Sequence, residues 1–124
     1  MRTNTSLTGR RGEAAVADYL TAMGHTVLAR NWRSGHLEID LVSEDKKGLH
    51  FVEVKTRSTA IFASPEENVG YVKQKRLVAA ARRFLASESG RFWGKEVFFD
   101  IAAVIDRDSH LEITFFPNAF IPTH

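Results

Sequence analysis

Cysteine is absent from this sequence of 124 residues. Without cysteine there is no disulfide framework, no thiolate zinc site and no thiol nucleophile, and the absence fits a reducing compartment. No apolar run approaches the length of a transmembrane helix, and the N-terminal stretch MRTNTSLTGRRGE has no apolar signal core. We therefore expect a cytoplasmic protein that does not associate with a membrane.

Several signatures of enzyme sites are also missing. The sequence has no glycine-rich phosphate loop, no nucleophile elbow and no dinucleotide-binding fingerprint. Its five histidines do not follow the spacing of a metal-ligand set. Only His36 is expected near the acidic residues described below, and we interpret it as a loop residue.

The composition is that of one folded domain covering residues 1–124. Hydrophobic residues make up 44% and charged residues 26%, as in ordinary globular proteins. The net charge is only +2, yet residues 71–95 carry seven lysines and arginines against one acid, Glu88. This local excess indicates either a phosphate-binding surface or the solvated face of a helix, and we favour the helix face.

Hydrophobic periodicity predicts two helices and five strands. Apolar residues recur at helical spacing over residues 9–23, and a capping-box pattern at Ser64, Pro65 and Glu67 predicts a second helix that runs to about residue 86. Strand patterns begin at residue 26 and cover residues 37–43, 49–57, 95–105 and 111–116. The order α-β-β-β-α-β-β indicates an α/β fold in which helices flank a mixed sheet.

The second and third strands form a hairpin in this interpretation. The intervening DKKG, residues 45–48, provides a glycine for a tight turn. A turn centred there pairs residues whose numbers sum to 93, which gives Asp40–Glu53, Glu38–Lys55, Ile39–Val54 and Leu41–Val52. One face of the hairpin then collects the charged residues, and the other collects the apolar ones.

The Asp40–Glu53 pair is costly in a purely structural sheet. Two carboxylates about 5 Å apart repel by roughly 3 kcal/mol at an effective dielectric constant of about 20. A divalent cation removes this cost, and Mg²⁺ favours carboxylates, water and phosphate as ligands. Lys55, on the same face, would orient the attacking water or stabilise developing negative charge. The alternative is that the two carboxylates lie at the wet ends of their strands and splay apart.

Other residues are candidates for the same site. Glu13, near the start of the first helix, either adds a third carboxylate or simply favours the helix dipole. Gln74 lies on the sheet-facing side of the second helix, where its amide either reaches Lys55 or a substrate phosphate or bonds to local backbone. We assign nucleic-acid contacts to four basic residues: Arg10, Arg11, Arg57 and Lys73.

The motifs GRRGEAAVADYL, RNWR, LEIDLV, FVEVKTR and ENVGYVKQKRLVAAARRFL, in this order, resemble the YraN family of bacterial proteins. The resemblance covers residues 9 to about 105. It implies a restriction-endonuclease-like fold with an αβββαβ core, similar to archaeal Holliday-junction resolvases. In the family pattern a glycine directly precedes the Glu-Ile-Asp run, whereas this chain has Leu37 there and Gly35 two positions earlier.

The resemblance implies a Mg²⁺-dependent endonuclease of the PD-(D/E)XK type, with Mn²⁺ as a substitute ion. Glu13, Asp40 and Glu53 would then hold the metal, Lys55 would be the catalytic lysine, and Gln74 would match a polar residue on the following helix. The expected partner is nucleic acid, DNA rather than RNA and branched or structured in form, bound by a homodimer. The alternatives are a nucleic-acid-binding module without catalysis and a protein-interaction subunit on the same fold.

Overall fold

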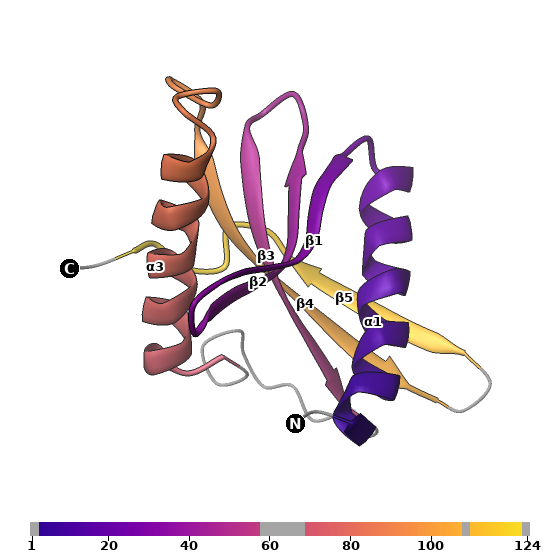
Figure 1. Cartoon of the computed structure of the whole chain (residues 1–124). Helices are drawn as coiled ribbons and strands as arrows, with labels where there is room; N and C mark the ends of the chain where they lie inside the picture. The colour runs from indigo at the N-terminus through magenta and orange to yellow at the C-terminus, as the bar shows by residue number, and fades with distance from the viewer. Residues whose placement is uncertain (1–2, 58–68, 108–109, 123–124) are drawn as a thin grey trace.

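In the part of the chain that the structure describes, a five-stranded mixed sheet carries one helix on each face (Figure 1). The computed structural model describes residues 3–57, 69–107 and 110–122, with side chains from residue 9 onward. Along the chain the elements are α1 (Thr3–Ala22), β1 (Thr26–Ser34), β2 (Leu37–Glu44), β3 (Leu49–Arg57), α3 (Tyr71–Ser87), β4 (Val97–Asp106) and β5 (Leu111–Phe116). The predicted order of helices and strands is confirmed.

The two helices begin at positions that differ from the prediction. Helix α1 starts at Thr3, six residues before the predicted position, because its first turns are polar and carry no apolar periodicity. Helix α3 starts at Tyr71, after Gly70 as its N-cap residue. The predicted capping box at residues 64–67 lies outside the described residues. None of the helices in the described ranges is long and apolar enough to cross a lipid bilayer.

The sheet has the strand order β1-β2-β3-β4-β5, so β3 is its central strand. It pairs antiparallel with β2 and parallel with β4. The predicted hairpin register is confirmed from Leu41–Val52 to Glu44–Leu49. The Asp45 backbone N–H donates to the Gly48 carbonyl and closes the turn.

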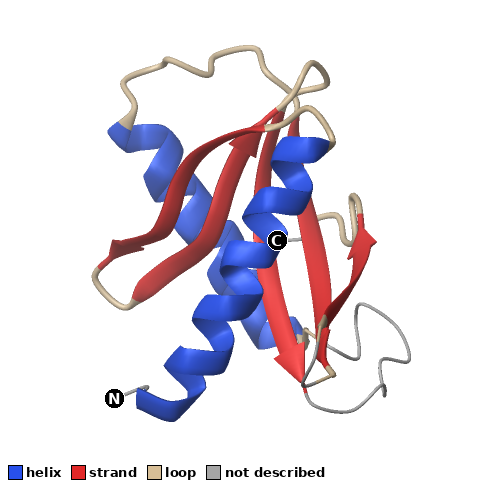
Figure 2. Ribbon diagram, turned by 90° about the vertical axis from the view of Figure 1, so that its right-hand side faces the viewer, coloured by secondary structure: helices blue, strands red, loops and turns tan. Residues whose placement is uncertain are grey.

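Figure 2 shows the strands of the sheet and the two helices as ribbons. Apolar side chains fill both faces of the sheet. On the α3 side, the core contains Phe51, Phe84 and Phe99. On the α1 side, it contains Leu20 and Val52. These two layers hold the sheet between the helices and fix the end of the hairpin that carries the acidic residues.

The predicted pairing of Ile39 with Val54 is wrong. Ile39 belongs to the core on the α3 side, whereas Val54 packs against the core on the α1 side. The reason lies in the ladder between β2 and β3, whose paired residues end at Leu41–Val52. Beyond that pair the two strands separate, and the simple alternation of faces no longer holds.

Candidate active site

An open cavity of about 520 Å³ lies where β2 and β3 separate, between the first half of α1 and the start of α3. Among the described residues, its lining combines four carboxylates with four cations, a charge pattern suited to binding a metal ion and a polyanion together. The acidic members are Glu13, Glu38, Asp40 and Glu53, and the basic members are Arg10, Lys55, Lys73 and Arg76.

Asp40 lies at the point where the two strands diverge. Its Oδ2 accepts a hydrogen bond of 2.8 Å from the backbone N–H of Val54, so the side chain takes the place of a backbone partner. The residue is only 7% exposed. This bond fixes the carboxylate across the gap, at the floor of the cavity.

Glu53 follows on β3 and faces the same cavity. It is 5% exposed, and its Oε2 lies 3.0 Å from Nζ of Lys73 on the first turn of α3. Lys73 was predicted to contact nucleic acid, and its pairing with Glu53 was not foreseen. In this structure its ammonium group neutralises one of the two buried carboxylates.

Burial is the main reason why the carboxyl groups of Asp40 and Glu53 are weaker acids than usual. It raises the pKa of Asp40 to about 7, with repulsion from Glu53 adding to the effect and the Val54 hydrogen bond opposing it. Burial also raises the pKa of Glu53, although the nearby charge of Lys73 opposes this. A buried carboxyl group that holds a proton near neutrality, as Asp40 does, is well prepared to exchange that proton for a cation.

Lys55 lies two residues after Glu53 and also lines the cavity. Burial lowers the pKa of its ammonium group, and repulsion from Lys73 and Arg57 lowers it further. A lysine with a lowered pKa holds its proton less firmly, which suits a group that orients or deprotonates water.

Close packing of α1 on β3 brings Glu13 and Arg10 to the cavity. A Cβ atom at Gly12 would collide with Oγ1 of Thr56, so glycine allows the helix to approach the strand this closely. Glu13, next in the chain, lies half-buried in the cavity lining. His36, in the turn between β1 and β2, also lines the cavity.

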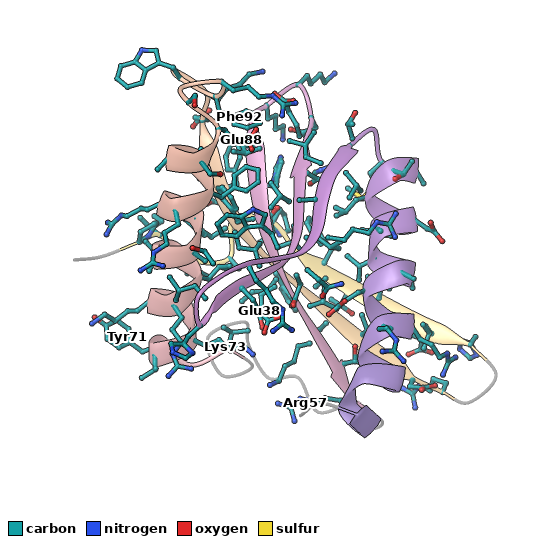
Figure 3. All side chains as sticks on the ribbon, viewed as in Figure 1. Glu38, Arg57, Tyr71, Lys73, Glu88 and Phe92 are labelled. Atoms are coloured by element: carbon teal, nitrogen blue, oxygen red, sulfur yellow. The ribbon has the colours of Figure 1, made fainter. Side chains whose placement is uncertain are left out.

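The remaining predicted residues lie elsewhere. Gln74 donates its Nε2–H to the Val69 carbonyl at 2.8 Å, which is the local backbone bond that the sequence left as an alternative. Arg11 forms an ion pair of 2.9 Å with Asp106. Arg57 is exposed at the end of β3, and Figure 3 shows it at the same end of the sheet as Glu38 and Lys73.

Sequence reasoning overlooked Arg76 and the role of Lys73. The two cations are three residues apart on α3, which puts them on neighbouring turns of one helical face. That spacing was visible in the sequence. Which part of the sheet this face meets depends on the long crossover from β3, and the sequence pattern does not specify it.

Comparisons with known proteins agree with this architecture. The sequence model of Uncharacterised protein family UPF0102 matches residues 12–104. A UPF0102 protein of Bacteroides thetaiotaomicron is 40% identical over 114 residues, which cover 92% of each chain. A UPF0102 protein of Oleidesulfovibrio alaskensis is 44% identical over 96 residues, 77% of this chain and 46% of the relative, so this chain spans about half of that relative.

Among solved structures, the chain is similar to Archaeoglobus fulgidus Hjc, a Holliday junction resolvase from an archaeal hyperthermophile. The TM-score is 0.53 at 22% sequence identity, over 86% of this chain and 73% of the resolvase. This likeness confirms the restriction-endonuclease-like fold. On the evidence of its sequence, the chain belongs to the UPF0102 family, which is the YraN family.

Proposed function

We propose that this protein is a divalent-metal-dependent endonuclease that hydrolyses phosphodiester bonds of DNA, with branched or otherwise structured DNA as its preferred substrate. The likeness of its fold to a Holliday junction resolvase supports the class of substrate. Because a fold alone does not establish an activity, the proposal depends on the chemistry of the cavity.

The single observation that carries the proposal is the pair of buried carboxylates Asp40 and Glu53 at the floor of an open cavity. Their mutual repulsion and burial disfavour the charged forms, and a divalent cation would compensate both effects. A donor set made only of oxygen atoms suits Mg²⁺ or Mn²⁺. Such an ion, when bound, would polarise the scissile phosphate and lower the pKa of a water molecule.

The protein's own groups then have distinct tasks. The Val54 N–H orients Asp40, and Glu13 adds a third carboxylate from α1. Lys55 would position the attacking water or neutralise charge that develops on the phosphate. Gln74 would act indirectly, by holding the start of α3 through its bond to Val69.

Cations at the rim of the cavity would bind the phosphate backbone. Arg10 on α1 and Arg76 on α3 both line the cavity. Lys73 would release Glu53 when a metal binds, and its ammonium group would then contact a phosphate. The side chain is half-exposed and lies on the first turn of α3, which leaves it access to the substrate. Arg11 and Arg57 would extend this contact along the outer ends of α1 and β3.

The test is a titration of chelator-treated protein with Mg²⁺ and Mn²⁺, followed by cleavage assays on a four-way junction and on a linear duplex of the same sequence. We expect saturable metal binding and metal-dependent cleavage of the junction. Both should be lost in Asp40→Asn. Both should persist in Glu44→Gln, a control that removes another β2 carboxylate, one that pairs with Lys95 at 2.8 Å.

One result would overturn the proposal. If the wild type binds no metal with or without the junction and leaves the junction intact, the chain is not a metal-dependent nuclease. Junction binding that survives chelation and weakens steeply with salt would then identify a binding module. No affinity for DNA in any form would point to a protein-interaction subunit.

The proposed substrate also predicts an assembly. A four-way junction offers two equivalent strands for cleavage, so a two-fold symmetric homodimer would present one cavity to each. Light scattering of the protein alone and with the junction would measure this. Two protein chains per junction are expected.

A further inference from the structure

A second cluster of ionisable side chains lies at the closed end of the β2–β3 hairpin, which is at the top of Figure 1 and away from the cavity. His25 directly precedes β1, Asp45 opens the hairpin turn, and His50 lies near the start of β3. Asp45 Oδ1 lies 2.8 Å from His50 Nε2, and Asp45 Oδ2 lies 3.5 Å from His25 Nε2. The spacing of histidines along the sequence did not indicate this cluster, because the fold brings together two histidines that are 25 residues apart.

Both imidazole rings are held by a partner on their other nitrogen. His50 Nδ1 lies 2.7 Å from Oδ2 of Asp100, which is fully buried. The other oxygen of Asp100 accepts the backbone N–H of Asn118 at 2.7 Å. His25 Nδ1 lies 2.9 Å from the buried Ser43 hydroxyl. Each Nε2 atom is thereby directed towards Asp45, as in metal sites where a carboxylate or hydroxyl orients a histidine ligand.

The separations of these atoms fit a small tetrahedral ion. Ligands about 2.0–2.1 Å from a tetrahedral zinc ion lie about 3.3 Å from one another. The two separations from Asp45 lie on either side of this value, and all three candidate ligand atoms lie within 4.8 Å of one another. The three side chains would have to draw closer together to bind one ion. The Asp45 side chain is 18% exposed and leaves a route from solvent.

We propose that His25, Asp45 and His50 bind a transition-metal ion, Zn²⁺ in particular, with water as the fourth ligand. Two imidazoles and one carboxylate form a set that favours Zn²⁺ over Mg²⁺, so this site differs in ligand chemistry from the cavity. The ion would join the start of β1, the hairpin turn and β3. Through His50 and Asp100 it would also fix β4.

A proton is the competitor of the metal at this cluster. In the metal-free protein, a proton on His50 would let the ring donate to Asp45 and Asp100 at the same time. Burial lowers the pKa of His25. A protonated imidazole nitrogen cannot bind a metal, so the ion and a proton on His50 Nε2 exclude one another.

The experiment uses the full chain without an affinity tag, stripped by a chelator. Co²⁺ is titrated in first, because a tetrahedral Co²⁺ site gives a strong visible absorption band, and Zn²⁺ is then added to displace it. We expect the tetrahedral Co²⁺ band to saturate at one equivalent and to disappear when one equivalent of Zn²⁺ is added. His25→Gln and Asp45→Asn should weaken binding by more than about 100-fold, beyond the roughly 10- to 100-fold expected for loss of an orienting partner.

Two control variants isolate the site. His110→Asn removes an exposed histidine that pairs with Glu112 at 3.3 Å, and Asp40→Asn alters only the cavity. Both should give the same tetrahedral Co²⁺ band as the wild type and should lose it when Zn²⁺ is added, because this band reports the histidine site and not the all-oxygen cavity. Asp45→Asn keeps an oxygen for the turn bonds from Lys47 and Gly48, so circular dichroism should show a folded chain. Absence of saturable binding in the wild type, or equal binding in His25→Gln and Asp45→Asn, would overturn the proposal.

Discussion

Among single residues, Asp40 links the stability of the protein to pH. Its pKa of about 7 in the folded state compares with 3.8 for an ordinary aspartate. Between these values the folded protein holds a proton that the unfolded chain has lost. The free energy of unfolding therefore falls as the pH rises through this window, because the unfolded state binds fewer protons.

Asp40→Asn should stabilise the metal-free protein. The amide cannot ionise, and its oxygen still accepts the Val54 N–H. In EDTA at pH 7.5 we expect the free energy of unfolding to rise by about 2–4 kcal/mol, and the difference should vanish near pH 4. Urea denaturation at both pH values measures it. A lower stability at pH 7.5 would show that the Asp40 charge stabilises the fold, contrary to this assignment.

Lys73 should compete with a metal ion for Glu53. Nζ lies 3.0 Å from the carboxylate, and the Glu53 charge raises the pKa of this lysine. Lys73→Met removes a positive charge beside the metal position, so Mg²⁺ should bind about fivefold more tightly, while junction DNA should bind more weakly. Calorimetry measures the first effect and fluorescence anisotropy the second.

Lys75→Met provides the matched control for this prediction. It removes the same charge from the same helix, but its Nζ lies over the Tyr71 ring, 5.4 Å from the centroid. Its Mg²⁺ affinity should equal that of the wild type. Equal changes in the two variants would mean that net charge, and not the contact with Glu53, determines metal affinity.

Among the elements, the contact between α1 and β3 determines where Glu13 lies. A methyl group at Gly12 would meet the side chain of Thr56, whereas a methyl group at Gly9 would meet nothing within 4 Å. Gly9→Ala should therefore stabilise the protein by up to about 1 kcal/mol through helix propensity. Gly12→Ala should destabilise it by about 1–3 kcal/mol and weaken Mg²⁺ binding, because the helix must move away from the strand. Thermal unfolding of both variants, with and without Mg²⁺, tests this.

Local patterns were sufficient to predict the elements and the register of the hairpin. The DKKG turn and the apolar alternation around Val52 depend on neighbours in sequence, and these rules hold well at short range. The break in the ladder at Asp40 was not predictable in this way, because there a side chain replaces a backbone partner.

Contacts across long separations were the ones that the sequence pattern missed. The pair Lys73–Glu53 depends on how α3 returns to the sheet, and His25–Asp45–His50 depends on where β1 begins relative to the hairpin turn. Asp100 lies within an apolar run of the sequence. The hydrophobic pattern there does not indicate that its carboxylate bonds to His50 in the core. Periodicity reports which face is buried, but not which polar groups meet there.

For the whole molecule, charge distribution predicts how DNA binding responds to salt. The net charge is only +2, so nonspecific attraction by the whole protein should be modest. Four cations line the cavity: Arg10, Lys55, Lys73 and Arg76. If each neutralises one phosphate, a plot of log affinity against log salt should have a slope of about −3 to −4.

A fluorescence titration of junction DNA at several salt concentrations measures this slope. The buffer contains Ca²⁺ in place of Mg²⁺ to prevent cleavage. Arg76→Met should reduce the slope by about one, whereas Arg91→Met should leave it unchanged. Arg91 serves as the control because it pairs with Glu88 near the far end of α3. An equal loss for both variants would indicate a diffuse basic surface.

The position of β3 at the centre of the sheet also has a consequence for the order of folding. Its pairing with β2 closes a short turn, whereas its parallel pairing with β4 joins residues 48 apart, such as Leu49 and Val97. Because short loops close first, we expect Asp40 and Glu53 to come together before α3 packs on the sheet and brings Lys73 to Glu53. The repulsion between these two carboxylates then raises the barrier to folding. Mg²⁺ or mild acid reduces this repulsion, so each should increase the refolding rate by a larger factor than it decreases the unfolding rate.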